Sequence, residues 1–575
     1  MPPSRLSENV IEPSTQSFDE THSDVQQGAV QDIKERIRIR IEEEIASPDD
    51  KEHGKWTRRG CTPWSFAFTD SPAVNPHEKQ AIKARHLHMI AAGGCVGAGL
   101  FVGAGSALAY GGPAAMLIGF SIVSVMIILV VQALGELAVM YPCSGSFYAY
   151  YSRFIHPSWG FALGWNYALT WMIAVPLELT VCAITMSYWN LNMSMAAYIA
   201  IYLVLIIVIA LFGSAAYGEE EFWSTCVKLG TMVIFTVISC ICITGHGPES
   251  GKFSVYQGTK TWSDPGAFAN GFKGVCFVLV AAAFALNGTE VIGLAVAETP
   301  KPGKVFPKLI KQISLRCVIF YFVPLILLGF LVPYNDTRLL SMAHGVHDAK
   351  ASPFVIVAHD SGYIGFDSFI NAIILIAVVS VGIASVYGGS RTLASLADDG
   401  MAPKFLGRRD VSGRAPWAIL SVIIFSNIAF MSVSTGGVNA FEWLLGLTGL
   451  SALINWGFIC LSHIFFRLAW KKAGRSLDEL EYKAPLGIGG SAFAVLLVAL
   501  AMIAQFYIAV SPIVGTPSAE AFFKTYLAVP CILAFAGGNW LYRRCKGIQR
   551  LDIPLDQDRR DHKPAVVEDI EKSPV

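Results

Sequence analysis

Apolar stretches long enough to cross a lipid bilayer dominate this chain from about residue 87 to about residue 543. About 20 consecutive apolar residues are enough for one membrane-spanning helix. Only 15% of the 575 residues are charged, whereas a soluble protein usually carries about 25%. Because lipid offers the backbone no hydrogen-bond partners, such segments fold as helices. The sequence therefore predicts an all-α polytopic membrane protein.

Twelve such apolar segments follow one another, and we expect each to cross the membrane once. Their approximate limits are 87–109, 113–139, 160–188, 196–215, 222–245, 271–297, 315–335, 366–395, 416–434, 440–467, 489–511 and 524–543. The longer segments would be tilted or bent. The prediction divides the chain into an N-terminal tail (1–85), a core of helices one to ten (86–467), helices eleven and twelve (468–545) and a C-terminal tail (546–575).

Positive charges between these spans are concentrated in alternate loops, after spans two, six, eight and ten. An excess of lysine and arginine near helix ends marks the cytoplasmic side of a membrane. This pattern predicts that both termini lie in the cytoplasm. The residues after spans six, eight and ten are Lys301, Lys304, Lys308, Lys311 and Arg316, then Arg391, Lys404, Arg408, Arg409 and Arg414, and then Arg467, Lys471, Lys472, Arg475 and Lys483.

Two of the apolar segments contain small and polar residues where a spanning helix should be smooth. The first break is residues 93–101 (GGCVGAGLF), and the second break is residues 284–290 (FALNGTE). A helix broken at membrane depth leaves backbone N–H and C=O groups that need other partners. Paired breaks in the two halves of a chain are typical of the substrate site of a secondary transporter.

The predicted topology makes the two broken helices partners. Spans one to five begin inside the cell, and spans six to ten begin outside. If the two quintets share one fold, they form a 5+5 inverted repeat in which broken helices one and six correspond. Spans eleven and twelve are then additional C-terminal helices.

The first break offers a site for an anion. Unwinding between Gly94 and Gly99 would expose N–H groups at the start of the outer half-helix, where the helix dipole is positive. Gly97, Ala98 and Gly99 are small enough to let a carboxylate reach the backbone. The alternative explanation is close helix packing, for which small residues are also used.

The second break offers acceptors for a cation. C=O groups freed around Phe284, Ala285 and Leu286 could accept hydrogen bonds from an ammonium group. Phe284 could also close over a bound solute, although packing alone explains a single phenylalanine. The two breaks together would offer donors for an anion beside acceptors for a cation.

Three ionisable residues lie inside the apolar spans. Glu178 lies late in span three, Lys228 about two turns into span five, and Glu290 just past the second break. Charges in lipid are costly and face the bundle interior or water, so each is a functional candidate. The two carboxyls could bind and release a proton. The alternatives are static carboxyls that hold helices together and a lysine that reaches the inner surface.

Several short strings resemble a known family of transporters. They are RHLHMIAAGG (85–94), GAGLFVG (97–103), QALGE (132–136), SGSF (144–147), GWNY (164–167), PLELT (176–180), YGE (217–219), GTE (288–290), LSH (461–463) and GRSLDEL (474–480). Together they resemble the fungal amino acid permease family of the amino acid–polyamine–organocation superfamily. The resemblance implies twelve spans, a leucine-transporter-like core in spans one to ten, and proton-coupled uptake of L-amino acids at the plasma membrane.

The resemblance also implies roles for single residues. Thr170 and Ala174 match family positions linked to side-chain selection, and a lysine at 228 can stand where related transporters bind sodium. The family usually has a serine at Ala285 and a small apolar residue at Asn287, so substrate choice is open. Since no acidic cluster suits a cationic side chain, we favour neutral amino acids. The predicted substrate site comprises Cys95, Val96, Gly97, Ala98, Gly99, Thr170, Ala174, Phe284, Ala285, Leu286, Asn287 and Glu290; the predicted proton-coupling residues are Glu178, Lys228 and Glu290.

The leading hypothesis is therefore a proton symporter that works by alternating access. An amino acid sensor of the same fold and an amino acid exchanger are the alternatives. No nucleophile–base pair or metal motif indicates an enzyme, and we expect no cofactor, metal or nucleic acid partner. The expected partners are L-amino acids, protons, the lipid bilayer and ubiquitin ligase adaptors at tail lysines. Those lysines are Lys34, Lys51 and Lys55, and Cys545 is a candidate for palmitoylation.

Overall fold

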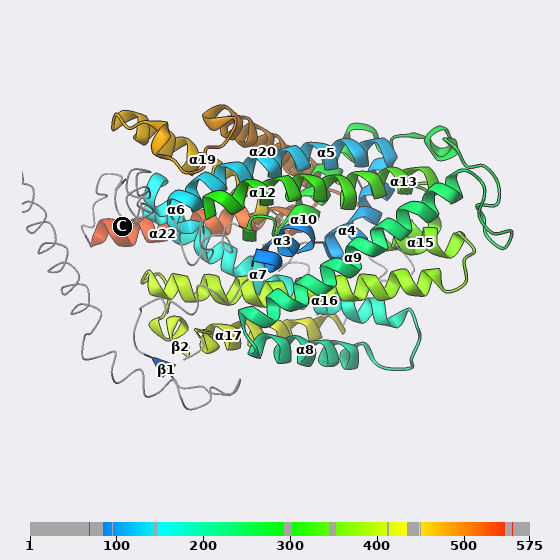
Figure 1. The fold of residues 1–575 in the computed structure, drawn as a ribbon, viewed down its shortest axis with the longest axis horizontal. Coiled ribbons are helices and arrows are strands. Elements are labelled where there is room, and N and C mark those ends of the chain that lie inside the picture. The colour runs from blue at the N-terminus through cyan, green and yellow to red at the C-terminus, as the bar shows by residue number, and fades with distance from the viewer. Residues whose placement is uncertain are drawn as a thin grey trace, which may run out of the picture. The chain divides into compact units, whose positions relative to one another are not determined.

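The computed structural model describes residues 68–69, 84–94, 96–141, 147–292, 302–343, 352–410, 413–433, 448, 450–513, 515–546 and 555. These residues are almost entirely helical (Figure 1). Lys34, Lys51 and Lys55 of the N-terminal tail, Cys95 of the first break and most of the C-terminal tail lie outside the described residues. The predicted roles of those residues stay predictions.

The first two predicted spans are divided differently from the sequence prediction. Helix α3 (Ala84–Gly93) ends at the first break, α4 (Ala98–Phe101) is a single turn, and α5 (Gly103–Met140) contains both the end of span one and all of span two. Within α5, Gly112 has φ 80° and ψ 171°, which glycine adopts at little cost. Pro113 follows and cannot donate a helical hydrogen bond. The chain therefore turns sharply at Gly112 and Pro113, and it is helical both before and after this turn.

The remaining helices follow the predicted apolar segments. Spans three to five correspond to α7 (Pro157–Ser187), α8 (Met195–Leu211) and α9 (Ser214–Ile243); span six begins with α10 (Gly271–Leu286); span seven comprises α12 (Pro302–Arg316), η4 (Cys317–Phe322) and α13 (Val323–Leu331). Spans eight to twelve correspond to α16 (Phe366–Asp398), α17 (Pro416–Ser426) with η7 (Asn427–Val433), α19 (Ser451–Lys472), α20 (Gly487–Val510), and α21 (Ala519–Tyr526) with α22 (Ala528–Cys545).

Short elements connect these helices. They are α6 (Tyr148–Tyr150), η2 (Tyr151–Ile155), η3 (Trp262–Gly266), α14 (Thr337–Ala343), α15 (Pro353–Asp360), η6 (Lys404–Gly407) and η8 (Leu477–Glu479). One two-residue pair of strands joins distant segments, because β1 (Phe68–Thr69) pairs antiparallel with β2 (Arg409–Asp410) in the register Phe68↔Asp410.

Eight helices of the described chain are long and apolar enough to cross a membrane, or nine when α21 and α22, bent by 62°, count as one span. Helices α8 and α10 are apolar but shorter. The polytopic helical fold is thus confirmed, whereas the number of twelve spans stays a prediction. Neighbouring helices pack so that α10 lies along α5, α16 along α7, and α3 against α9 (Figure 1).

Two arginines predicted in cytoplasmic loops are instead buried in helices. Arg316 ends α12, which begins at Pro302 rather than near residue 315, and its side chain is 2% exposed. Arg467 of α19 donates a hydrogen bond of 2.6 Å to Glu136 of α5, and His463 lies 3.1 Å from the same carboxylate. The loop prediction was wrong here because each arginine contacts a buried polar residue of a distant segment, Thr289 for Arg316 and Glu136 for Arg467. Sequence spacing does not reveal such partners.

Candidate functional site

The first break unwinds the chain where the sequence predicted. The amide of Val96 donates to the carbonyl of Gly93 at 3.0 Å, and Gly97, with φ −149° and ψ −142°, precedes α4 without a side-chain cap. Helix N-termini carry N–H groups that need acceptors from elsewhere. The amide of Ala98 lies within hydrogen-bonding reach of the Glu178 carboxyl of α7. The N–H group predicted to attract an anion therefore already faces a carboxyl side chain.

The small residues of the first break also allow close packing. A Cβ atom on Gly99 would lie 2.7 Å from Cα of Ala285, and one on Gly97 would lie 2.6 Å from Cγ2 of Val381 on α16. The first and second breaks are thus in direct backbone contact at Gly99 and Ala285. The sequence offered two explanations for these glycines, access of a ligand to the backbone and tight helix packing. Both require a residue without a side chain at these positions.

The Glu178 side chain is buried, 5% exposed, in the middle of α7. Its Oε2 atom accepts no hydrogen bond from any described residue, while the charge of Lys228 acts on the carboxyl from α9. A buried acceptor of this kind is normally paired. The free oxygen beside the first break is therefore available to a proton or to a bound solute.

Lys228 is completely buried, so it does not reach the membrane surface. Its Nζ atom donates to Oγ of Ser380 at 3.1 Å and to the carbonyl of Gly93 at 3.4 Å, and it lies 3.6 Å from Oε1 of Glu221. Glu221 is also 0% exposed. The ammonium thus connects the end of α3 to α9 and α16, as a bound cation would.

The sequence analysis missed Glu221, although a signal for it was present. Glu221, Ser224, Thr225 and Lys228 are spaced i, i+3, i+4 and i+7, so they share one face of α9, and all four are buried. Thr225 donates to Glu221 at 2.9 Å. A polar stripe along an apolar span predicts a buried polar contact with neighbouring helices.

The second break ends α10 at Leu286, again as predicted. The three carbonyls expected to be free each accept one hydrogen bond from within the chain: Phe284 from the amide of Asn287 at 3.2 Å, Ala285 from the hydroxyl of Tyr321 at 2.8 Å, and Leu286 from the hydroxyl of Thr289 at 2.7 Å. A carbonyl oxygen has two lone pairs. Each can therefore still accept a hydrogen bond from a ligand.

Glu290, just past the second break, is fully buried between two other helices. Its Oε2 atom accepts a hydrogen bond of 3.1 Å from Trp456 of α19. Arg316 of α12 donates to the hydroxyl of Thr289, and its charge acts on the Glu290 carboxyl. Arg316 is the second residue of this region that the sequence analysis missed, because its distance of 26 residues along the chain hides the contact.

The other predicted site residues are placed as follows. Thr170 is buried and donates to the carbonyl of Asn166 at 2.9 Å, and Ala174, Phe284 and Asn287 are half-buried. Asn287 accepts a hydrogen bond of 2.9 Å from the amide of Gly288, which fixes the turn after α10. The structure thus brings the two breaks together with Glu178 and Lys228. Contacts among the described residues do not show whether Thr170 or Ala174 selects the substrate side chain.

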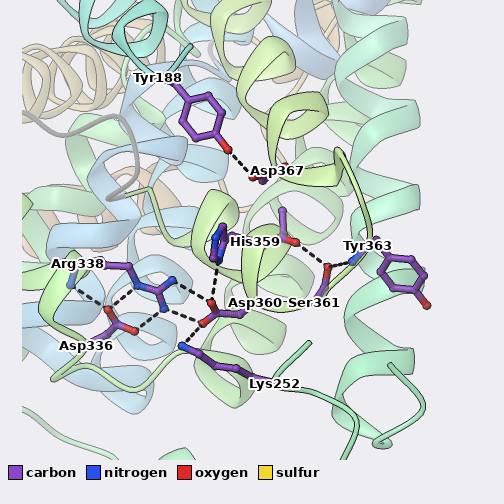
Figure 2. A network of polar contacts seen from close by, with 10 residues as sticks. Tyr188, Lys252, Asp336, Arg338, His359, Asp360, Ser361, Tyr363 and Asp367 are labelled. Atoms are coloured by element: carbon purple, nitrogen blue, oxygen red, sulfur yellow. Dashed lines mark hydrogen bonds and ion pairs between the residues drawn. The ribbon is translucent and has the colours of Figure 1, made fainter. Parts of the chain in front are cut away.

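The start of the short helix α15 contacts α4. Ser352, which precedes α15, donates to the carbonyl of Phe101 at 2.7 Å, and the rings of Phe101 and Phe354 are 5.1 Å apart. Figure 2 shows Arg338 between Asp336 and Asp360, with Lys252 reaching Asp360 from another loop. Arg338 lies 2.6 Å from Asp360 Oδ2, and Lys252 lies 2.9 Å from the same atom. We call these four charged residues the α15 latch.

The two carboxylates of the α15 latch have lowered pKa values. Burial alone would raise the pKa of Asp360, but hydrogen bonds from Arg338, Lys252 and His359 outweigh it and lower that pKa to about 2. The pKa of Asp336 is also lowered, since the hydrogen bonds and charge of Arg338 outweigh its burial. Both carboxylates therefore stay ionised in mildly acidic medium.

Comparisons with known proteins identify the family of this chain. The sequence model of the amino acid permease family matches residues 86–551. The chain is 49% identical over 521 residues to amino-acid permease inda1 of Hypocrea atroviridis, covering 90% of this chain and 91% of that protein. It is 44% identical over 472 residues to general amino-acid permease GAP1 of Saccharomyces cerevisiae, covering 81% and 77%.

A third relative is cationic amino acid transporter 1 of Schizosaccharomyces pombe, which is 43% identical over 482 residues, covering 83% of this chain and 81% of that protein. The match extends over the spans on both sides of the two breaks. This chain therefore belongs to the amino acid permease family and is a multi-pass membrane protein.

Proposed function

We propose that this protein imports L-amino acids across the plasma membrane by proton symport, with both termini in the cytoplasm. The observation that carries the proposal is the contact between the two breaks beside a buried, partly unpaired carboxyl. Gly99 lies against Ala285, and the Glu178 carboxyl faces the amide of Ala98. Unwound helices at membrane depth are tolerated where they line a site rather than lipid.

The substrate would bind across the two breaks through the groups common to all amino acids. Its carboxylate would accept hydrogen bonds from the N–H groups of residues 97–99, at the positive end of α4. Its ammonium would donate to the remaining lone pairs of the carbonyls of residues 284–286. Val96, Asn287 and Glu290 would complete this part of the site, as would Cys95.

Proton coupling follows from competition at the amide of Ala98. The ionised Glu178 carboxyl and the substrate carboxylate cannot both occupy one helix N-terminus without strong repulsion in a low-dielectric site. A proton on Glu178 removes that repulsion, so proton binding and substrate binding favour each other. Lys228 supplies a permanent cation between α3, α9 and α16, which makes a sodium ion unnecessary.

Glu290 was also predicted to couple protons, and its surroundings favour a narrower role. The charge of Arg316 acts on the Glu290 carboxyl, whose Oε2 atom also accepts a hydrogen bond from Trp456. A carboxylate beside the carbonyls of the second break would attract an ammonium group. We therefore assign Glu290 chiefly to attraction of the substrate ammonium, and Glu178 with Lys228 to proton coupling.

The side chain of the substrate would contact residues of α7. Ala174 is small and Thr170 already donates to its own helix, so neither offers a charge to the substrate. A neutral amino acid is the substrate that this lining favours. Alternating access would move spans one, two, six and seven as a bundle against the other spans.

The deciding experiment is competition of labelled amino acid uptake by all twenty amino acids, at acid and neutral pH, with and without sodium. Symport predicts faster uptake at acid pH and no effect of sodium. Surface protein that binds amino acids without moving them would identify a sensor. Uptake that requires amino acid on the other side, at any pH, would identify an exchanger.

A further inference from the structure

A small cavity away from the two breaks is lined by three arginines, Arg391, Arg409 and Arg414. It lies among α8, α9, α16, α17 and the loop between β2 and α17, and its volume is about 60 Å³. Such a volume holds a few water molecules or one group of the size of phosphate. None of the described lining residues is acidic. The cavity therefore offers a positive surface to a small anion.

Two of the arginines are held in place by carboxylates that do not line the cavity. Nη2 of Arg409 donates to Oδ2 of Asp398 at 2.7 Å, and the backbone of Arg409 is paired with Thr69 across β1 and β2. Nη2 of Arg414 lies 2.6 Å from Oδ2 of the buried Asp410. A guanidinium carries several N–H donors in a fixed fork. The single hydrogen bond from the Arg409 guanidinium to Asp398 therefore leaves it donors for a ligand.

The start of α9 adds backbone donors to the same cavity. Gly213, with φ 77°, precedes α9 without a side-chain cap, and both Gly213 and Ser214 line the cavity. The first N–H groups of a helix have no acceptor within the helix, and the helix dipole favours an anion there. Arg391 lines the cavity from α16, with its guanidinium 5.4 Å from the ring centroid of Tyr387. Guanidinium groups and helix N-termini are both donors that bind phosphate.

The lining favours an anion over a second molecule of amino acid. Every amino acid carries an ammonium group, which can only donate hydrogen bonds and needs acceptors. The described lining has three positive charges and no carboxylate to receive it. A phosphate group needs only donors, and arginine matches its geometry.

The surroundings of the cavity indicate that the phosphate belongs to a lipid. Large apolar side chains are exposed on the two helices that border the cavity, Val208 and Phe212 on α8 and Trp417 and Leu420 on α17. In a chain that spans a membrane, such side chains face lipid. The loop charges place this end of the spans toward the cytoplasm. Basic pockets between membrane helices on that side bind phosphorylated lipid head groups.

We propose that this cavity binds the phosphate of an anionic phospholipid from the cytoplasmic leaflet. The phosphate would accept hydrogen bonds from the three arginines and from the first N–H groups of α9, while the acyl chains would lie along α8 and α17. The proposal rests on the orientation given in the proposed function and adds a lipid site separate from the substrate site. Because the lipid would contact several helices at once, its binding would stabilise the folded protein.

The test measures binding of phosphatidic acid to the purified full-length protein in detergent. Native mass spectrometry counts bound lipid, and the unfolding temperature is recorded as lipid is added. We expect phosphatidic acid to bind and to raise the unfolding temperature, and phosphatidylcholine, whose choline balances its phosphate charge, to do neither. Arg409→Gln should weaken binding by about tenfold or more, because it loses a charge-assisted hydrogen bond. Arg408→Gln, at an exposed arginine outside the lining, is the matched control.

Ser214→Asp tests the same cavity without removing an arginine. An aspartate in the first turn of a helix is favourable for that helix, but here it would add a negative charge to the lining. Binding of phosphatidic acid should therefore fall by about tenfold or more. Ala215→Asp adds the same charge at an exposed residue outside the lining and should bind the lipid as the unmodified protein does. This pair decides the question if Arg409→Gln does not fold.

The outcomes separate the lipid site from the function on which its orientation rests. Equal binding by the unmodified protein, Arg409→Gln and Ser214→Asp would overturn the site. If inorganic phosphate alone raises the unfolding temperature as much as phosphatidic acid at equal concentration, the ligand is a soluble anion and the lipid assignment is wrong. A C-terminal tag that is labelled from outside intact cells would overturn the orientation, and with it the cytoplasmic leaflet. Absence of amino acid uptake would overturn the proposed function alone, because lipid binding is measured without transport.

Discussion

The two breaks meet at Gly99 and Ala285, yet they satisfy their exposed backbone groups in opposite ways. At the first break, an amide at a helix N-terminus is met by the carboxyl of Glu178 from another span. At the second, carbonyls at a helix C-terminus are met by the hydroxyls of Tyr321 and Thr289. A hydroxyl stays neutral at physiological pH, whereas a carboxyl can bind or release a proton there if its surroundings shift its pKa. We therefore propose that the first break binds the proton and that the second orients the substrate.

The two breaks also differ in the number of carboxyls that surround each positive charge. More than one carboxyl acts on the ammonium of Lys228 near the first break, whereas at the second break the charge of Arg316 acts on the single carboxyl of Glu290. An uncompensated buried charge is the condition under which a protein binds or releases protons. Under the proposed function, we therefore expect the first break to respond to pH more strongly than the second.

The largest expected effect comes from removing the cation of the first break. Lys228→Met leaves Glu221 buried without its partner, which costs about 3–5 kcal/mol. We expect uptake to fall by more than about a hundredfold, measured as initial uptake rate per molecule at the cell surface. Lys260→Met, at an exposed lysine, should transport normally. Uptake by Lys228→Met at the unmodified rate and pH response would show that the first break does not depend on this charge.

The second largest loss of uptake is expected where the two breaks are in contact. Gly99→Ala places a Cβ 2.7 Å from Cα of Ala285, whereas Gly103→Ala meets no atom within 4 Å. Overpacking costs about 1–3 kcal/mol, so uptake by Gly99→Ala should fall by about ten- to hundredfold. Uptake should be unaffected in Gly103→Ala. Equal activity of the two variants would contradict direct contact of the breaks during transport.

The proposed roles of Glu178 and Glu290 can be tested by replacing each glutamate with glutamine. Glu290→Gln should raise the KM for amino acids about tenfold, because a charge-assisted interaction is worth about 1.5–3 kcal/mol. It should leave the pH response of uptake in place. Glu178→Gln should abolish that response. If Glu290→Gln instead abolishes it, the coupling proton binds at the second break. The double variant Glu290→Gln with Arg316→Gln controls for a stranded arginine charge.

The smallest effect is expected at the α15 latch, away from both breaks. The folded-state pKa of Asp360 is about 2, below its ordinary value, so its stabilisation is complete above the ordinary value of about 4 and is lost as pH falls toward the folded value. Asp360→Asn should therefore destabilise the purified protein by about 1–3 kcal/mol, equally at mildly acid and neutral pH. Thermal unfolding at both pH values measures this.

Lys252→Ala is the matched variant for the latch. The Lys252 side chain is 66% exposed, so its pair with Asp360 should contribute less than about 1 kcal/mol. A destabilisation by Asp360→Asn that disappears at mildly acid pH would mean that the latch, and not only the first break, titrates during uptake.

The local features of the site were predictable from the sequence because they depend on short-range chemistry. The run of small residues at 93–101 and the Asn-Gly pair at 287–288 interrupt helices wherever they stand, and α3 and α10 end at Gly93 and Leu286 as expected. Glu178, Lys228 and Glu290 stood out because a charge inside an apolar span is unfavourable without partners. Even Glu221 was visible in principle through its spacing from Lys228.

The partners of those charges were decided by the tertiary structure. Arg316 and Arg467 were read as loop charges, yet they meet Thr289 and Glu136 from distant spans. The same holds for Ser380, which joins Lys228 to two carboxyls only because α16 packs against α9. By itself the sequence determined a helical membrane protein with two interruptions and three buried charges. Only the packing of helices decided which charges balance, because burial and Coulomb energies depend on distances between segments that the linear order does not set.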